Sequence, residues 1–330
     1  MRRVLLIVCC GLPFVAPELS LAAGGPVPPF QGRGISAPGS SVSYVAVGAG
    51  GDTVVRRARR GGGKIGGSTR LPGRFGVAGA ANDGSTTGLS ADGRTLVLAG
   101  IISTYPPKRT RLVVLDTGRL IADARIGLTG YYTVDAISPR GRWLYLIHYM
   151  SPNRNPTRYE VRAYDVVGRH LMRQPVIDPR DRGEAMLGLA VTRTMSADGR
   201  WAYTLYDRPG STPFIHALDT ERRQAVCVDL PAIAESDVFN ARLALADGGG
   251  TLRVERSGVP VASVNTRTYT VDSPGAGRLQ SVPRRASSAR HGGAPWLPLA
   301  AALIAALGAV AALRMRDAPD QWARTVKRSE

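Results

Sequence analysis

The sequence predicts an all-β domain built from repeated four-stranded units, and three observations carry this prediction. A turn of the form Ser-x-Asp-Gly or Ser-x-x-Gly occurs three times between short apolar runs, at residues 90–93, 138–141 and 196–199. These copies start 48 and 58 positions apart, a spacing typical of repeat units that stack side by side. With 44% hydrophobic residues and 39 glycines, the composition favours many short strands joined by tight turns.

Each turn opens a series of four predicted strands. The first strand follows the turn directly (95–99, 143–147 and 201–205). The second ends in Asp-Thr or Asp-Val (112–117, 161–166 and 215–220). The third comes after a short turn (120–126, 171–177 and 224–230), and the last leads into the next Ser-x-x-Gly turn (133–137 and 191–195). The alternation of apolar and polar residues in these runs is typical of half-buried strands.

Weaker copies flank the three clear ones. Residues 243–249 repeat the strand-and-turn pattern and precede predicted strands at 251–255, 259–264 and 267–271. Residues 42–47, 53–55 and the Gly-rich stretch 56–73 supply an opening unit. Residues 41–273 therefore hold about five units, and the sequence predicts a β-propeller of about five four-stranded blades. The strand at 42–47 is expected to lie beside 267–271 and close the ring.

The repeats resemble those of the YVTN-type β-propeller repeat family, a WD40-like family whose units contain a Ser-Pro-Asp-Gly turn and a strand ending in Ile-Asp-Thr. The resemblance covers residues 86–247 and implies a bacterial, membrane-anchored propeller. Such repeats occur in surface-layer proteins, lactonase-like enzymes and binding modules, so the resemblance implies a fold and leaves the function open.

The N-terminal segment is typical of an export signal. A basic start, an apolar run at 4–15 and small residues at 20 and 22 predict a signal peptide over residues 1–22. Residues 23–40 hold four prolines and no apolar periodicity, which predicts a disordered lead-in. The ectodomain is then expected at 41–273.

The C-terminal segment is typical of a membrane anchor. Residues 274–294 are rich in Pro, Gly, Ser and Arg and predict a flexible stalk. Residues 295–313 are uncharged, long enough to cross a bilayer and followed by Arg314 and Arg316. We therefore expect a single-pass protein of the cell membrane, with the propeller extracytoplasmic and residues 314–330 as a cytoplasmic tail.

The net charge of +18 permits two interpretations. It favours attraction to anionic polymers or lipid headgroups, and the run Arg56-Arg57-Ala58-Arg59-Arg60 is the densest part of it. The alternative is a compositional bias, because only three of the 43 basic residues are lysines. Export excludes nucleic acid as the partner. Cys227 is the one cysteine after the predicted signal peptide and is expected to be a buried, inert thiol.

No linear motif predicts catalysis, a cofactor or a metal. The four histidines (His148, His170, His216 and His291) lack the spacing of a zinc site. Glu184, Asp135, Asp237 and Arg193 are expected to converge at the central channel if the protein is a lactonase-type hydrolase. The sequence thus predicts no catalytic, cofactor-binding or metal-binding residues.

We expect a non-catalytic binding or scaffolding module on the cell surface. Its partner is expected to be a protein or an anionic cell-envelope polymer, with the membrane contacted through residues 295–313. Two alternatives stay open: a propeller hydrolase of the lactonase type, and a sensor whose tail contacts a cytoplasmic partner.

Overall fold

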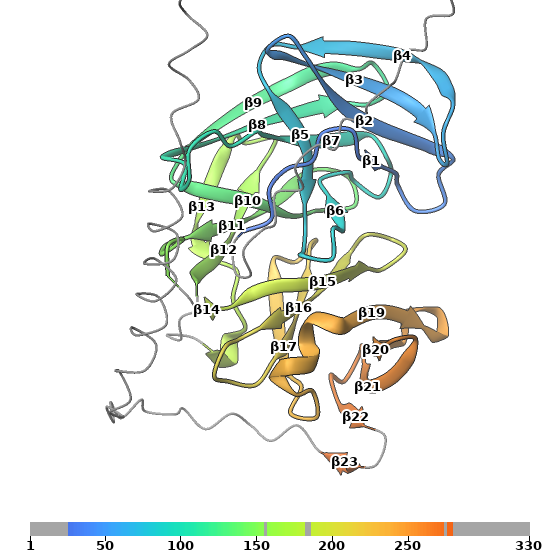
Figure 1. The fold of residues 1–330 in the computed structure, drawn as a ribbon, viewed down its shortest axis with the longest axis vertical. Coiled ribbons are helices and arrows are strands. Elements are labelled where there is room, and N and C mark those ends of the chain that lie inside the picture. The colour runs from blue at the N-terminus through green and yellow to red at the C-terminus, as the bar shows by residue number, and fades with distance from the viewer. Residues whose placement is uncertain (1–25, 155–156, 182–185, 274–275, 280–330) are drawn as a thin grey trace, which may run out of the picture. The chain divides into compact units, whose positions relative to one another are not determined.

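The computed structural model describes residues 26–154, 157–181, 186–273 and 276–279, which form five antiparallel sheets in chain order (Figure 1). The first sheet contains β1 (Gly34–Ile35), β2 (Val42–Ala49), β3 (Asp52–Arg59) and β4 (Lys64–Leu71). The second contains β5 (Phe75–Gly79), β6 (Thr86–Thr87), β7 (Thr95–Gly100), β8 (Arg109–Asp116) and β9 (Ile121–Thr129). The third contains β10 (Tyr131–Ile137), β11 (Trp143–Tyr149), β12 (Arg158–Asp165), β13 (His170–Pro175) and β14 (Met186–Leu187).

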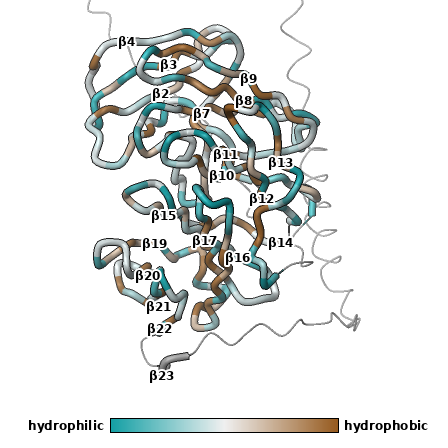
Figure 2. Tube along the Cα trace, turned by 180° about the vertical axis from the view of Figure 1, so that it is seen from behind, coloured by the Kyte–Doolittle hydropathy of each residue, from teal (hydrophilic) through white to brown (hydrophobic). Residues whose placement is uncertain are grey.

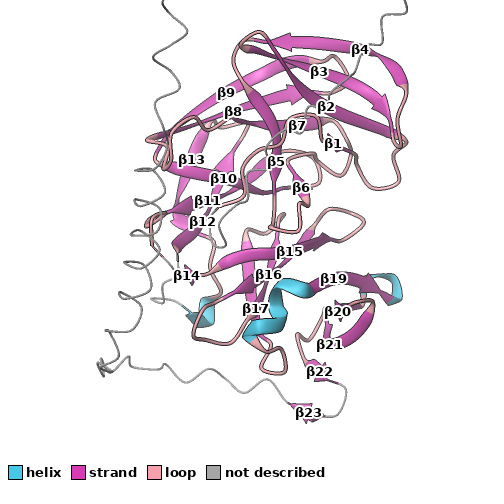
Figure 3. Cartoon of the chain, viewed as in Figure 1, coloured by secondary structure: helices cyan, strands magenta, loops and turns pink. Residues whose placement is uncertain are grey.

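The last two sheets complete the series. The fourth contains β15 (Leu189–Met195), β16 (Trp201–Asp207), β17 (Phe214–Asp219) and β18 (Gln224–Asp229). The fifth contains β19 (Ala241–Ala246), β20 (Thr251–Arg256), β21 (Val259–Asn265), β22 (Val271–Ser273) and β23 (Ala276–Leu279). Three short 3₁₀ segments lie among the described strands: η1 (Pro179–Asp181) between β13 and β14, η2 (Glu235–Asn240) between β18 and β19, and η3 (Asp247–Gly249) between β19 and β20 (Figure 3). The predicted all-β fold of five propeller-like units with four to five strands is confirmed; membership of the YVTN-type family stays a prediction.

The Ser-x-x-Gly segments are hairpin turns, as predicted. In the copy at 196–199, the Gly199 N–H donates to the Ser196 carbonyl at 2.8 Å, and Gly199 has a φ of 72°. This left-handed conformation suits glycine because a Cβ would be strained there. The Ser196 hydroxyl donates to Asp198 at 2.5 Å and accepts from the Trp201 N–H at 2.8 Å. The side chains therefore satisfy backbone groups that the tight turn leaves free.

A second turn repeats at the strand ends. Asp165 and Asp219 each accept two backbone N–H groups at 3.0 Å, from residues two and three positions later. Asn265 accepts the same pair of bonds in the fifth sheet. The residue four positions after the acidic or amide residue has positive φ in four sheets (Leu120, Arg169, Arg223 and Tyr269). The fifth sheet is thus a full repeat whose aspartate is replaced by asparagine.

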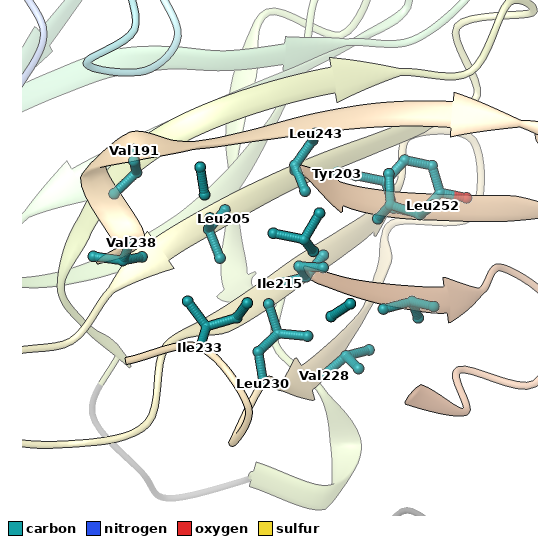
Figure 4. Packing of buried hydrophobic residues seen from close by; sticks show 14 of the residues in the cluster. Val191, Tyr203, Leu205, Ile215, Val228, Leu230, Ile233, Val238, Leu243 and Leu252 are labelled. Carbon is teal, nitrogen blue, oxygen red and sulfur yellow. The ribbon is translucent and has the colours of Figure 1, made fainter. Parts of the chain in front are cut away.

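Four hydrophobic cores lie between successive sheets among the described residues. Figure 4 shows the core between the fourth and fifth sheets, where Leu205 and Ile215 face Leu243 and Leu252. The apolar stretches run along strands such as β8 and β17, and many of the connecting turns are hydrophilic (Figure 2). Burial between neighbouring faces is therefore the main force that stacks the units.

The predicted seam between 42–47 and 267–271 is wrong. Strand β2 pairs with β1 on one edge and with β3 on the other, so neither edge is open. Residues 266–268 form a turn, and β22 pairs with β21 and β23. Both predicted seam edges are covered by neighbouring residues of the chain, and the described residues contain no fifth core between the last sheet and the first.

The boundaries of the predicted lead-in and stalk also need correction. Residues 26–40 are ordered rather than disordered, because Val27 and Ile35 are buried and Phe30 pairs with Val77. The predicted stalk 274–294 begins inside the fifth sheet, where Ala276–Leu279 pairs with β22. The predicted signal peptide 1–22, membrane helix 295–313 and tail 314–330 lie outside the described residues. Within the described ranges, no helix has both the length and the apolar character to cross a membrane.

Candidate binding site

A buried ion pair joins the third and fourth sheets. Arg193 on β15 donates from Nη1 to Asp135 Oδ1 on β10 at 3.0 Å, and also to the Asp135 carbonyl. The two residues are 8% and 2% exposed. Thr87 on β6 donates to the same carbonyl at 3.0 Å, so strands of three sheets meet at one residue. Breaking such a pair from one side leaves a buried charge and is strongly destabilising.

The pair leaves hydrogen-bonding capacity unused. Within the described part of the chain, Arg193 Nε and Nη2 and Asp135 Oδ2 have no hydrogen-bond partner. Buried polar atoms of this kind are uncommon in folded proteins and call for a ligand, an ion or a water. Arg193 therefore retains donors at the place where the sheets meet.

A second contact fixes β15 against the second sheet. The Asn82 and Asp83 N–H groups donate to the Ala190 and Val191 carbonyls at 3.0 Å. The Thr192 hydroxyl donates to Asp83 Oδ2 at 2.7 Å. The loop between β5 and β6 thus holds β15 through three hydrogen bonds at the residues that precede Arg193.

Arg193 also lines a pocket of about 640 Å³. The other walls come from the first sheet, the β3–β4 turn and the segment around β6. The lining contains three arginines, six hydroxyl side chains and no carboxylate (Arg59, Arg60, Arg193; Ser36, Ser43, Ser85, Thr86, Thr87, Thr194). Arginine and hydroxyl donors together are suited to a ligand that carries anionic oxygens.

The β3–β4 turn presents Arg59 and Arg60 at this pocket. The Arg60 N–H donates to Ser41 at 2.7 Å and the Arg59 N–H to Gly63 at 2.9 Å, which fixes the turn. Gly61, Gly62 and Gly63 all have positive φ. Both arginine side chains are exposed, and neither has a carboxylate within 4 Å among the described residues. Their charges are available to a partner.

The rest of the arginine run is not uniform. Arg57 donates to the Gly118 carbonyl at 2.5 Å and to the Thr117 carbonyl, so it joins the first sheet to the second. Arg56 is exposed. Arg57 therefore has a structural role and is not available to a partner in the way that Arg59 and Arg60 are.

Charge is concentrated in the first sheet because acidic residues are missing there. Residues 26–73 contain seven basic residues and one acidic residue, Asp52, which is paired with Arg70 at 2.8 Å. Residues 188–240, which include the fourth sheet, contain five basic and seven acidic residues. A codon bias toward arginine adds cations everywhere but does not remove carboxylates from one segment. The asymmetry favours a local anionic partner.

Of the four residues expected to converge in a hydrolase, the structure brings two together. Asp135 and Arg193 form the buried pair, whereas Asp237 pairs with Arg256 on the fifth sheet. Glu184 lies outside the described residues. The hydroxyls around Arg193 were not predicted, because nothing in the linear sequence distinguishes Ser85 or Thr87 from other turn residues.

The histidines and Cys227 differ in their surroundings, and His216 Nε2 has no hydrogen-bond partner among the described residues. His216 is 1% exposed, and burial lowers its pKa, so its ring is neutral near pH 7. His148 contacts Glu160 at 3.3 Å and stacks on Tyr132. His170 is exposed, and His291 lies outside the described residues. Cys227 is half-buried beside Asp178 and Asp181. The Asp178 carboxylate accepts hydrogen bonds from Arg180 and from the Cys227 N–H.

No protein-family model matches the chain, and no curated protein matches it. Among solved structures, hydrazine synthase of Kuenenia stuttgartiensis is 14% identical with a TM-score of 0.45, over 77% of this chain and 68% of that one. The Cps50 (Swd1) β-propeller domain of Myceliophteria thermophila is 9% identical with a TM-score of 0.41, over 69% and 62%. TolB of Acinetobacter baumannii is 11% identical with a TM-score of 0.38, over 75% and 52%. The chain thus spans about half to two thirds of these structures, and we draw no functional conclusion from them.

Proposed function

We propose that the protein is a non-catalytic binding module for an anionic polymer of the cell envelope. The observation that carries this proposal is the pocket lined by Arg59, Arg60 and Arg193 without a carboxylate. The basic first sheet supports it, because a surface of one sign raises the local concentration of an oppositely charged polymer.

The pocket and the first sheet contribute to polymer binding in different ways. Arg59 and Arg60 are exposed, so their attraction to the polymer is long-range and weakened by salt. Arg193 is buried, so a hydrogen bond to it is short-range and depends on the shape of the ligand. One anionic group of the polymer enters the pocket, and neighbouring groups lie along the first sheet.

Binding to immobilised polymers tests the proposal. The purified full chain is passed over polygalacturonate, polyphosphate and neutral dextran by surface plasmon resonance at 50 and 300 mM NaCl. We expect binding to one or both anionic polymers, none to dextran, and weaker binding at the higher salt concentration. Comparing the first two polymers distinguishes carboxylate from phosphate recognition.

Charge-matched variants locate the site. The double variant Arg59→Gln/Arg60→Gln is expected to lose at least tenfold in affinity. The control Arg222→Gln/Arg267→Gln removes the same charge from exposed positions on the fourth and fifth sheets and is expected to lose less than threefold. Equal losses in both variants would contradict a local site and favour a nonspecific effect of net charge.

We further propose that the binding domain is extracytoplasmic and anchored by residues 295–313. The support is the sequence itself: a signal-like segment at 1–22, an uncharged 19-residue run and an arginine pair after it. Expressed in bacteria, the full chain is expected in the membrane fraction and a chain ending at residue 294 in the periplasm or medium. Recovery of both from the cytosol would contradict the proposal.

A further inference from the structure

A second pocket, separate from the polymer site, lies where the second and third sheets meet. It has a volume of about 450 Å³, within the usual range of small-molecule sites. Its walls come from the lead-in, β5, the β7–β8 loop and β10. The body of the pocket is apolar or aromatic (Val27, Pro29, Ile101, Ile102, Pro106, Pro107, Tyr131, Tyr132, Val134).

The β7–β8 loop is held in place around this pocket. The Tyr105 hydroxyl donates to the Pro152 carbonyl at 2.8 Å, and its ring meets Tyr131 edge to face at 5.7 Å. At the two ends of the loop, the Ile101 N–H donates to Arg74 at 3.0 Å and the Gly130 N–H to Lys108 at 2.9 Å. The pocket walls are therefore formed before a ligand arrives, which reduces the entropy lost on binding.

The charged residues of the lining are all cationic, and its other polar residues carry hydroxyls (Ser103, Thr104, Thr110 and Thr133). Lys108, Arg109 and Arg111 follow one another closely at the start of β8 and are all exposed. None has a carboxylate within 4 Å among the described residues, and the lining contains no Asp or Glu. An apolar pocket with only positive charges favours a ligand whose body is apolar and whose headgroup is anionic.

We infer that this pocket binds a small organic anion with an aromatic or aliphatic body. The body lies against Tyr131, Tyr132 and Ile102, and the anionic headgroup lies at Lys108 on the β7–β8 loop. This inference does not depend on the polymer-binding function, because the two pockets share no lining residue.

Three ligands of the same shape test the charge requirement. Isothermal titration calorimetry of the full chain compares 2-naphthoate, neutral 2-naphthamide and cationic 2-naphthylmethylammonium. We expect 2-naphthoate to bind at least tenfold more tightly than the amide, and the ammonium compound not to bind. Equal affinities for the acid and the amide, or tighter binding of the cation, would overturn the inference.

Variants then assign binding to this pocket. Lys108→Gln is expected to weaken 2-naphthoate at least tenfold, while Lys108→Arg keeps most of the affinity because it keeps the charge. Arg140→Gln is a matched control at an exposed position outside the pocket and is expected to change affinity less than twofold. Ser103→Trp places a bulky side chain on the exposed loop and is expected to block the pocket. Unchanged binding in both the charge variant and Ser103→Trp would overturn the assignment.

Discussion

In the second, fourth and fifth sheets, a threonine after the turn aspartate or asparagine links two turns (Thr117, Thr220 and Thr266). Thr220 is fully buried, and its hydroxyl donates to the carbonyl of Arg200 at 2.8 Å and of Gly199 at 3.1 Å. Thr117 makes the equivalent bond to Gly93, and Thr266 bonds Gly249 at 2.7 Å. The Asp-Thr signature therefore has two roles. The aspartate accepts backbone N–H groups of its own turn, and the threonine hydroxyl donates to the turn that precedes the neighbouring strand.

Replacing this hydroxyl tests its contribution. Thr220→Val keeps the shape of the side chain but leaves a buried carbonyl with one bond fewer. We expect the free energy of unfolding to fall by about 1–2 kcal/mol. Urea denaturation followed by tryptophan fluorescence measures the change. The control Thr268→Val, at an exposed position, is expected to stay within about 0.5 kcal/mol of the wild type, and a similar loss there would contradict the explanation.

Some site residues could be anticipated from the sequence and some could not. The arginine run at 56–60 was visible because charge density is a local property. The pairing of Asp135 with Arg193 links residues 58 positions apart, and it was anticipated only as convergence of inner strands. Arg57 is structural because carbonyls of the second sheet lie within reach of its side chain, whereas the Arg59 side chain has no such partner among the described residues. Only the fold decides this difference.

Among the elements, the lead-in departs most from expectation. Its prolines and its lack of periodicity predicted disorder, yet it packs on β5 because that strand has glycines where it passes. A Cβ on Gly76 would lie 2.6 Å from the Phe30 carbonyl, and one on Gly79 would lie 2.3 Å from Val27. The glycines that decide where the lead-in packs are thus in β5, and the sequence alone does not distinguish them from other strand residues.

Gly76→Ala tests this contact. We expect the added methyl group to displace the lead-in and to lower the free energy of unfolding by about 1–3 kcal/mol, since the obstacle is backbone. Trypsin cleavage after the exposed Arg33 is expected to become several times faster. Gly127→Ala is the control, because a Cβ there meets only the end of the flexible Arg109 side chain. Unchanged cleavage in Gly76→Ala would show that the lead-in does not depend on this glycine.

At the scale of the whole molecule, the strands predicted from local sequence patterns are present. The predicted pairing of residues 42–47 with 267–271 is absent from the described residues. Number, order and pairing of the strands came from short-range features: alternation, turn residues and Asp-Thr endings. The predicted seam could not be derived from such features, because it depends on which strand edge the rest of the chain covers. Here Gly34–Ile35 covers the edge of β2 and Ala276–Leu279 that of β22.

The turn aspartates give the whole domain a dependence on acid pH. Backbone N–H groups of Arg119 and Gly168 lower the pKa of Asp116 and Asp165. Burial alone would raise the pKa of Asp219, but hydrogen bonds from Arg200 and the backbone outweigh it and lower the pKa. A carboxyl group with a lowered folded-state pKa stabilises above its unfolded value, here about 3.8, and loses that contribution as the pH falls through the folded value.

We therefore expect the triple variant Asp116→Asn/Asp165→Asn/Asp219→Asn to fold at pH 7, since Asn265 makes the same turn bonds naturally. Its melting temperature is expected to fall less steeply than that of the wild type between pH 5 and pH 3. Differential scanning calorimetry across this range measures both slopes. The control Glu221→Gln/Asp247→Asn is expected to keep the wild-type slope. A triple variant with the wild-type slope would contradict the assignment.

Four hydrophobic cores are shared among five sheets in the described part of the chain, so the second, third and fourth sheets each pack on two neighbours. The first and fifth sheets each contribute to one of these cores. Because fewer apolar contacts hold these two sheets, local unfolding of the domain is expected to begin in them.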